Sequence, residues 1–192
     1  AYETKIGRGT FTAFAAAGVA FPATNYIADF LPLSIGLHST NVSGRIIADY
    51  DLGNFFVTAS GTYTYRNNIT IDRTSYYTTE MHLTNEVEMP DMAMEQLRTG
   101  YRSRWWRLEA VVDNMTTLGG FDIRRNDMPF PSNKMNSTDA GVFVKYTLKK
   151  IPALSFSADA SYVLAGRNVG QSAMVGGGVY YVLDFNSKKP SK

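Results

Sequence analysis

The sequence predicts an all-β chain that folds as a transmembrane, antiparallel, up-and-down β-barrel of eight strands. Three observations predict this fold. Several segments of about ten residues alternate apolar and polar side chains, the connections between them alternate in length, and aromatic residues gather at the segment ends. Successive side chains of a strand point to opposite faces, so each segment has one apolar and one polar side. A tilted strand of about 9–11 residues is long enough to cross a bilayer core.

The first four predicted strands differ in how clearly they alternate. Segment 9–21 is apolar on both faces, whereas 41–52 places apolar residues at every second position from Val42 to Leu52. Segment 55–66 is the clearest, because its odd positions are apolar or glycine from Val57 onward and its even positions carry threonine, serine and arginine. Segment 93–103 alternates weakly. Each is predicted as a strand with one face toward lipid.

The last four predicted strands repeat this pattern. They cover 105–117, 138–149, 154–165 and 172–185. In 154–165 the even positions are apolar or aromatic while the odd positions are mostly serine and aspartate, and in 172–185 the odd positions form an unbroken apolar face. Helical periodicity is not sustained over any long window, so the sequence predicts strands throughout.

The connections alternate between tight turns and long segments. Gly53-Asn54, Ser103-Arg104 and 150–153 are tight, whereas 22–40, 67–92 and 118–137 are long and 166–171 is of intermediate length. Outer-membrane barrels have short periplasmic turns and longer extracellular loops. This sorting predicts location in the outer membrane, with both termini on the periplasmic side.

The composition suits a single barrel domain over residues 1–185, followed by a short basic periplasmic tail at 186–192. Mean hydropathy is -0.18, and the absence of any apolar run of 18 or more residues argues against a helical membrane span. The formal net charge of +2 predicts no nucleic-acid partner, and the absence of cysteine excludes disulfides and thiolate chemistry. No signal peptide is evident, which predicts either its removal or a truncated chain.

Aromatic residues at the strand ends are predicted to form girdles at the two membrane interfaces, although tyrosine and tryptophan also favour strands in general. The periplasmic girdle would contain Tyr50, Phe55, Trp106, Tyr146, Tyr181 and Phe185, and the outer girdle would contain Tyr63, Tyr65 and Tyr162.

The opposite face of the strands carries nearly balanced charges that are predicted to line the lumen. They are Arg45, Asp49, Arg66, Arg98, Arg102, Arg107, Glu109, Asp113, Asp139, Lys145, Asp159 and Asp184. Two interpretations are open: mutually paired charges that fill a narrow interior, or a water-filled and weakly charge-selective channel. Eight strands leave an interior that side chains can fill, whereas a conducting pore needs more strands.

The predicted extracellular loop at 118–136 is the most distinctive connection. Its candidate residues are Asp122, Arg124, Arg125, Asp127 and Phe130. The loop could fold into the mouth of the barrel or contact lipopolysaccharide phosphates through its arginines; an ordinary solvated loop with internal ion pairs is the alternative. The loop at 67–94 offers Tyr76, Tyr77 and several methionines to an apolar solute or a partner protein.

No enzymatic activity, metal or cofactor is predicted. His38 and His82 are the only histidines, and although Ser75 and Asp72 lie near His82, no nucleophile motif such as G-x-S-x-G accompanies them. Neither metal-ligand spacing nor a phosphate-binding glycine loop is present.

Four phrases carry a resemblance to a known family: PLSIGLHST (32–40), DRTSYYT (72–78), LGGFDIRRNDMPFPSN (118–133) and GRNVGQS (166–172). With the strand pattern, they resemble Gram-negative, Bacteroidetes-like outer-membrane transporters of the MetA-pathway phenol-degradation type. Members of that family have roughly a dozen strands, in line with the even counts of such barrels. The resemblance therefore implies that this chain is the C-terminal eight strands of a larger barrel. If 192 residues is the whole mature protein, a small closed barrel is expected instead.

The sequence thus predicts a porin-like protein for passive transport of small, including hydrophobic, solutes. Its expected partners are outer-membrane lipids and lipopolysaccharide. The first alternative is a non-conducting scaffold barrel that belongs to a larger outer-membrane complex and pairs all of its internal charges. The second alternative is a soluble ligand-binding barrel, which detergent-free solubility would reveal.

Overall fold

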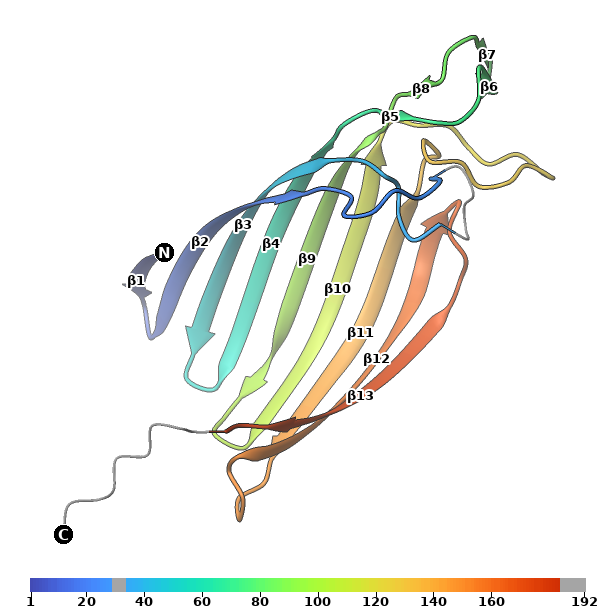
Figure 1. The fold of residues 1–192 in the computed structure, drawn as a ribbon. Helices are drawn as coiled ribbons and strands as arrows, with labels where there is room; N and C mark the ends of the chain where they lie inside the picture. The colour runs from blue at the N-terminus through green and yellow to red at the C-terminus, as the bar shows by residue number, and fades with distance from the viewer. Residues whose placement is uncertain (29–33, 184–192) are drawn as a thin grey trace.

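The computed structural model describes residues 1–28 and 34–183 and contains one large antiparallel sheet of nine strands (Figure 1). In spatial order these are β1 (Tyr2–Ile6), β2 (Gly9–Ala20), β3 (Asn41–Leu52), β4 (Phe55–Arg66), β9 (Asp91–Arg102), β10 (Trp106–Leu118), β11 (Asn136–Thr147), β12 (Leu154–Arg167) and β13 (Ala173–Tyr181). The described residues include no helix long and apolar enough to cross a membrane. The prediction of an all-β, antiparallel, up-and-down chain is confirmed.

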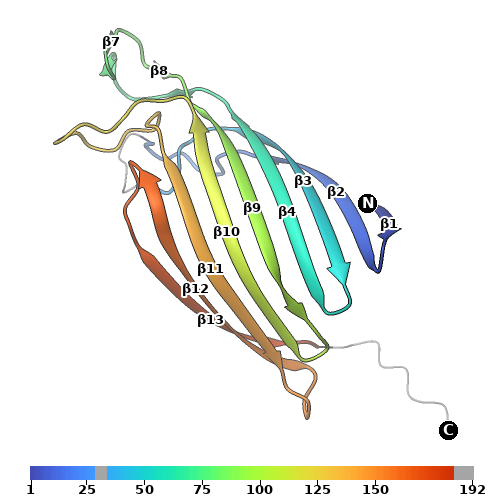
Figure 2. The ribbon, with the colours of Figure 1, turned by 180° about the vertical axis from the view of Figure 1, so that it is seen from behind.

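The sheet is strongly curved around a hollow that remains open on one side (Figures 1 and 2). Each strand pairs with the next strand of the sheet along the chain, so successive connections alternate between the two ends, and the three longest lie at the same end. We call these the turn end and the loop end. The turn end holds 7–8, 53–54, 103–105 and 148–153, and the loop end holds 21–28, 34–40, 67–90, 119–135 and 168–172.

The predicted closed barrel of eight strands is not confirmed. An additional strand, β1, pairs with Gly9–Ala13 of β2, and no pairing joins β1 or β2 to β13. The sequence pattern missed β1 because YETKI is short and does not continue into a ten-residue alternation. Curvature alone does not close a sheet, since closure also needs two edges in hydrogen-bonding register.

The loop end folds into a small structure of its own. Its ladders are β5 (Ile69–Thr70) with β8 (Glu86–Val87), and β6 (Tyr76–Tyr77) with β7 (Met81–His82). Ala28, Ile69, Ile71, Val87 and Met89 form a buried apolar cluster against which Leu37, Tyr76 and Phe130 pack. Among the described residues this is the main buried cluster, so the long connections are packed rather than extended chain.

Candidate functional site

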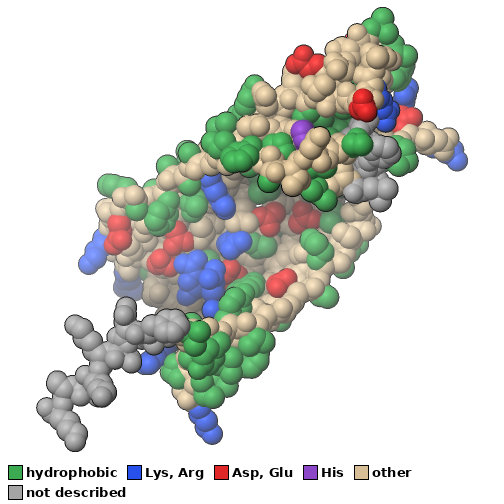
Figure 3. Space-filling model, viewed as in Figure 1, with side chains coloured by type: hydrophobic (Ala, Val, Ile, Leu, Met, Phe, Trp, Pro, Cys, Tyr) green, Lys and Arg blue, Asp and Glu red, His purple; other side chains and the backbone are tan. Residues whose placement is uncertain are grey.

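The two faces of the sheet differ in chemistry, because residues opposite each other in an antiparallel ladder share a face. Asp49 lies opposite Thr58, and Thr58 lies opposite Arg98. The same register places all the described charges predicted to line a lumen on one face: Arg45, Asp49, Arg66, Arg98, Arg102, Arg107, Glu109, Asp113, Asp139, Lys145 and Asp159. This face is concave, and Figure 3 shows acidic and basic groups lining the hollow. Asp184 lies outside the described residues.

Glu109 of β10 is the centre of an ion-pair cluster on the concave face near the turn end. Only 4% of its side chain is exposed, and its carboxylate lies 2.5 Å from Arg107, 3.6 Å from Arg98 and 3.9 Å from Arg102. Arg102 also lies 3.7 Å from both Asp49 and Asp51. Its guanidinium packs 3.4 Å above the Phe56 ring. These charges are mutually paired, as buried charges must be.

The other concave charges have no ion-pair partner among the described residues. Arg45 donates to Ser60 at 2.9 Å and to Gln96 at 3.4 Å. Asp113 accepts a 2.6 Å bond from Gln96, and Asp139, its direct neighbour across the ladder, accepts a 3.0 Å bond from Ser137. The Lys145 ammonium lies 4.6 Å from the centre of the Tyr180 ring.

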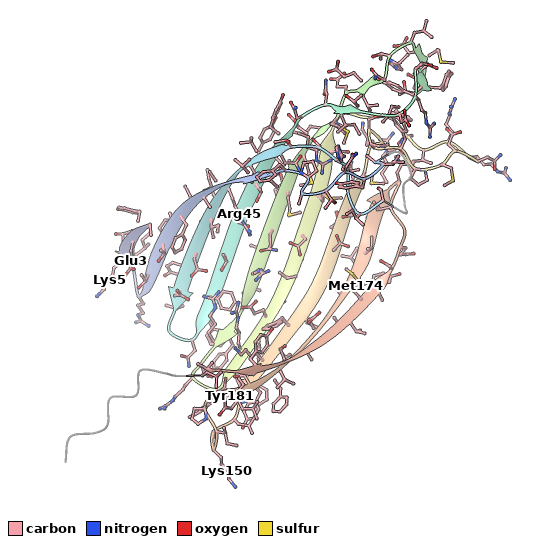
Figure 4. All side chains as sticks on the ribbon, viewed as in Figure 1. Glu3, Lys5, Arg45, Lys150, Met174 and Tyr181 are labelled. Atoms are coloured by element: carbon pink, nitrogen blue, oxygen red, sulfur yellow. The ribbon has the colours of Figure 1, made fainter. Side chains whose placement is uncertain are left out.

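A groove of about 390 Å³ crosses the concave face between β9 and β12. Arg98, Arg107 and Glu109 line it together with Asp113 and Asp159. Gly141 forms part of its wall, where a Cβ would lie only 2.9 Å from the Ala160 carbonyl oxygen. The groove therefore combines a neutralised arginine cluster with carboxylates that have no cation against them. Figure 4 labels Arg45 and Met174, which lie on the concave side of β3 and β13.

The opposite, convex face is apolar and exposed. Ile46 is 69% exposed, Val175 is 86% exposed, and the aromatic residues predicted for the girdles lie on this side. At the turn end these are Tyr50, Phe55, Trp106, Tyr146 and Tyr181, and toward the loop end they are Tyr63, Tyr65 and Tyr162. Phe185 lies outside the described residues. Ring pairs join neighbouring strands, with Trp106 4.5 Å from Tyr146 and Phe55 5.5 Å from Tyr101.

Glu95 interrupts the convex face. It lies on β9 directly opposite Asn114 of β10, whose amide donates a 2.9 Å bond to Thr138 of β11. Glu95 also borders two shallow grooves, of about 470 and 570 Å³, whose other lining residues are largely small or apolar. Glu95 was not among the residues predicted from the sequence, although it shares the odd positions of its strand with Ala93 and Leu97. An acidic residue at a position where the alternation predicts an apolar side chain was the signal that could have identified Glu95.

The predicted loop residues divide into two groups. Asp122 accepts bonds from Arg167 at 2.7 Å and from Asn168 at 2.9 Å, and these contacts lower the pKa of Asp122 to about 2. Arg124 pairs with Asp127 at 2.8 Å and lies 4.5 Å from the centre of the Tyr77 ring. The hydrogen bond from Arg124 to Asp127 raises the pKa of the arginine. The loop thus contains internal ion pairs, while Arg125 is exposed.

Phe130 belongs to an aromatic stack that joins the connection at 119–135 to the connection at 67–90. The His82 and Tyr76 rings stack at 4.7 Å with an interplanar angle of 9°, and Phe130 stacks on Tyr76 at 5.4 Å. His82 Nε2 hydrogen-bonds the Thr78 hydroxyl at 2.8 Å. Ser75 and Asp72 make no hydrogen bond to His82 in the described part of the chain, so the structure does not assemble these three into a hydrolytic triad. Within residues 1–28 and 34–183, no three His, Asp or Glu side chains gather to hold a metal ion.

Comparison of the chain with protein-family models, with curated proteins and with solved structures finds no match. The function must therefore be argued from the two faces of the sheet and from the loop end.

Proposed function

We propose that this chain forms the wall of an outer-membrane β-barrel through which small solutes pass passively. The observation that carries the proposal is the division of one sheet into an apolar convex face with aromatic rings near both ends and a charged concave face. A sheet that contacts lipid needs an apolar face, and a sheet that lines a water-filled passage needs a polar one. The turn end then faces the periplasm and the loop end faces outward, toward lipopolysaccharide.

Strand length supports this orientation. β3 and β4 each contain 12 residues, which at about 3.3 Å per residue span roughly 40 Å. Tilted by about 35–45°, such strands cover the apolar band of about 25 Å and both interfaces. Exposed side chains such as Ile46 and Val175 would be costly in water as one continuous surface, and lipid removes that cost.

Eight strands leave an interior narrow enough for side chains to fill, but incomplete charge pairing favours a narrow hydrated passage over a filled scaffold. A non-conducting barrel would pair its internal charges, and the cluster around Glu109 does so. Asp113 and Asp139, however, lie opposite each other with only neutral hydrogen-bond partners. Two neighbouring carboxylates without a cation beside them need water, because the desolvation of an unpaired charge costs free energy.

Closure of the barrel is part of the proposal. β1 pairs with only the first half of β2 and leaves Phe14–Ala20 with a free edge, and β13 has a free edge along its whole length. Eight strands run from β2 to β13, so these two strands are antiparallel. Unpaired backbone groups are not tolerated against lipid. The free part of β2 therefore pairs with β13 in the membrane.

Engineered disulfides test this closure, because the chain has no cysteine of its own. Ala17→Cys on β2 is combined in turn with Ala173→Cys, Val175→Cys or Val179→Cys on β13, all on the convex side. The control pair is Ala48→Cys with Ala59→Cys, which are direct ladder partners. After refolding in lipid and mild oxidation, an intrachain crosslink in at least one test pair is expected. Crosslinks only between copies, or none while the control forms, would contradict closure within one chain.

Conductance in planar bilayers tests the passage itself. The refolded 192-residue chain is expected to give discrete, reproducible openings. A folded and crosslinked chain that remains silent would refute the passive passage. Stable solubility without detergent would instead favour a soluble ligand-binding sheet.

A scaffold role in a larger membrane complex is the second candidate, and Glu95 is the observation that favours it. A carboxylate beside Asn114 on the convex face is costly against lipid and would be covered by a partner protein. Silence in bilayers together with co-purification of a partner that Glu95→Leu releases would support this role.

A further inference from the structure

The loop end contains a cavity of about 580 Å³ between the end of β4, the β6–β7 hairpin and the start of the connection after β10. We propose that this cavity binds a neutral saccharide. The inference is independent of the proposed passage, because it rests on the loop end and the adjoining ends of β4, β9 and β10. The lining residues include Tyr65, Arg66, Tyr76, His82, Glu88 and Phe121.

The cavity is preformed. Tyr76 is held between the His82 and Phe130 rings and packs against the buried cluster that contains Ile69 and Val87. This fixes the β6–β7 hairpin, which supplies one wall. A site whose walls are already ordered loses little conformational entropy when a ligand binds.

Two glycines let the opposite wall form. Gly119 and Gly120 have φ values of +132° and +77°, which residues other than glycine rarely adopt. A Cβ on Gly120 would lie 2.5 Å from the Ser132 carbonyl oxygen. The close approach of these two backbone segments therefore depends on glycine, and it places Phe121 and Ser132 at the cavity.

Polar groups at the cavity remain available to a ligand. Arg66 makes one side-chain hydrogen bond among the described residues, a weak contact of 3.3 Å to the Met92 sulfur. The Glu88 carboxylate is exposed and has no hydrogen-bond or ion-pair partner among them.

This mixture of groups matches a polyhydroxylated ring. Each sugar hydroxyl both donates and accepts, and the cavity offers a guanidinium donor, a carboxylate acceptor and groups such as the Thr79 hydroxyl that do both. The apolar faces of a sugar ring can pack against Tyr65 and Phe121. The volume lies within the usual range for small-molecule sites, roughly 300–1,000 Å³.

Charge argues for a neutral ligand. Glu88 and Asp91 both line the cavity and would repel an anion, whereas Arg66 would repel a simple cation. Asp91 is already occupied, since it accepts from the Tyr63 hydroxyl and from the Arg66 backbone amide. Glu88 is therefore the carboxylate expected to contact the ligand.

The same chemistry could come from a free sugar or from the glycan of a membrane lipid, and titration calorimetry of the refolded chain separates them. The probes are galactose, N-acetylglucosamine, lactose and an uncharged oligosaccharide released from a membrane glycolipid. Millimolar binding of a free sugar supports a soluble ligand, and binding of the oligosaccharide alone supports a membrane glycan.

Glu88→Gln is expected to weaken binding at least about fivefold. Glu80→Gln, the same change on an exposed residue that does not line the cavity, is expected to leave it unchanged. The backbone amide spectrum of each variant establishes that the loop end is folded. The proposal is overturned if no saccharide binds at any sugar concentration from 50-fold above that of the protein up to the solubility limit of the sugar. It is equally overturned if folded Glu88→Gln binds as the native chain does, or if acetate or ethanolamine binds more tightly than every sugar.

Discussion

At the scale of single residues, the loop end offers a carboxylate whose environment can be tested directly. Asp122 has a pKa of about 2, caused first by its hydrogen bonds to Arg167 and then by Asn168, with a smaller contribution from the charge of Lys134. Because the folded pKa is below the ordinary aspartate value of 3.8, the stabilisation is complete above about pH 4 and is lost as pH falls toward 2. We predict that Arg167→Gln raises the pKa of Asp122 toward 3.8.

Carboxyl chemical shifts measured across an acid titration check this prediction. Lys134→Gln is the comparison variant, and it is expected to move the pKa of Asp122 much less because Lys134 acts only through its charge. An Asp122 pKa that stays near 2 in Arg167→Gln would mean that the ion pair does not set it.

Glu109 is the second residue with a measurable role. Loss of one partner from a buried charge cluster typically costs about 3–5 kcal/mol. The three arginines around Glu109 keep 37–44% of their side chains exposed, so solvent screening reduces the expected loss to about 2–3 kcal/mol. We predict that Glu109→Gln lowers the free energy of unfolding by that amount.

Urea unfolding followed by tryptophan fluorescence measures this loss, since Trp105 and Trp106 lie at the start of the same strand. Asp159→Asn is the matched control. It removes a concave carboxylate for which no hydrogen bond or ion pair is seen among the described residues, and a change below about 0.5 kcal/mol is expected. Equal losses in the two variants would contradict a special role for Glu109.

At the scale of strands, Gly100 of β9 lies where a side chain would meet the backbone of β10. A Cβ at this position would lie 1.9 Å from the Leu108 carbonyl oxygen and 2.9 Å from the Glu109 Cα, so the paired strand must move to admit a side chain. We predict that Gly100→Ala lowers the free energy of unfolding by about 1–3 kcal/mol. Gly61→Ala on β4 meets nothing within 4 Å and should be neutral or slightly stabilising.

The same urea titration distinguishes the two glycine variants. Hydrogen exchange then locates the loss, which is expected at the amides that join β9 to β10 and not at those that join β3 to β4. A Gly100→Ala chain as stable as the Gly61→Ala chain would show that the strands accommodate the methyl group without cost.

At the scale of the whole molecule, the concave charges determine ion preference if the proposed passage is open. In water, two unit charges about 4 Å apart interact with an energy of about 1 kcal/mol, which changes the local concentration of a permeating ion about fivefold. We predict that Asp113→Asn combined with Asp159→Asn shifts permeability several-fold toward anions, because Arg45 and Lys145 remain. The zero-current potential in a salt gradient measures this shift.

The control for ion preference is Asp122→Asn, which removes the same charge from the loop end instead of the concave face. It is expected to change the zero-current potential little. A double variant that conducts with unchanged selectivity would place the ion path away from the groove between β9 and β12.

Much of the fold followed from local pattern. Side-chain alternation with a period of two located most of the long strands within a few residues, for example 55–66 and 154–165 against β4 (Phe55–Arg66) and β12 (Leu154–Arg167). The same period assigned Arg45, Glu109 and Asp159 to one face, because a residue's parity along a strand determines its side. Connection lengths likewise identified the turn end and the loop end.

Other features depended on how strands and connections meet in space, and only the tertiary structure decided them. The short strand β1, the free edges of β2 and β13, and the pairing of Glu109 with Arg98 and Arg102 of β9 arise from register between strands, which alternation within one strand does not encode. The stack of His82, Tyr76 and Phe130 brings together two connections that no periodic pattern links. The sequence by itself determined which residues form strands and which face each occupies. The tertiary structure decided how those faces curve, where charges meet, and that the loop end encloses a cavity.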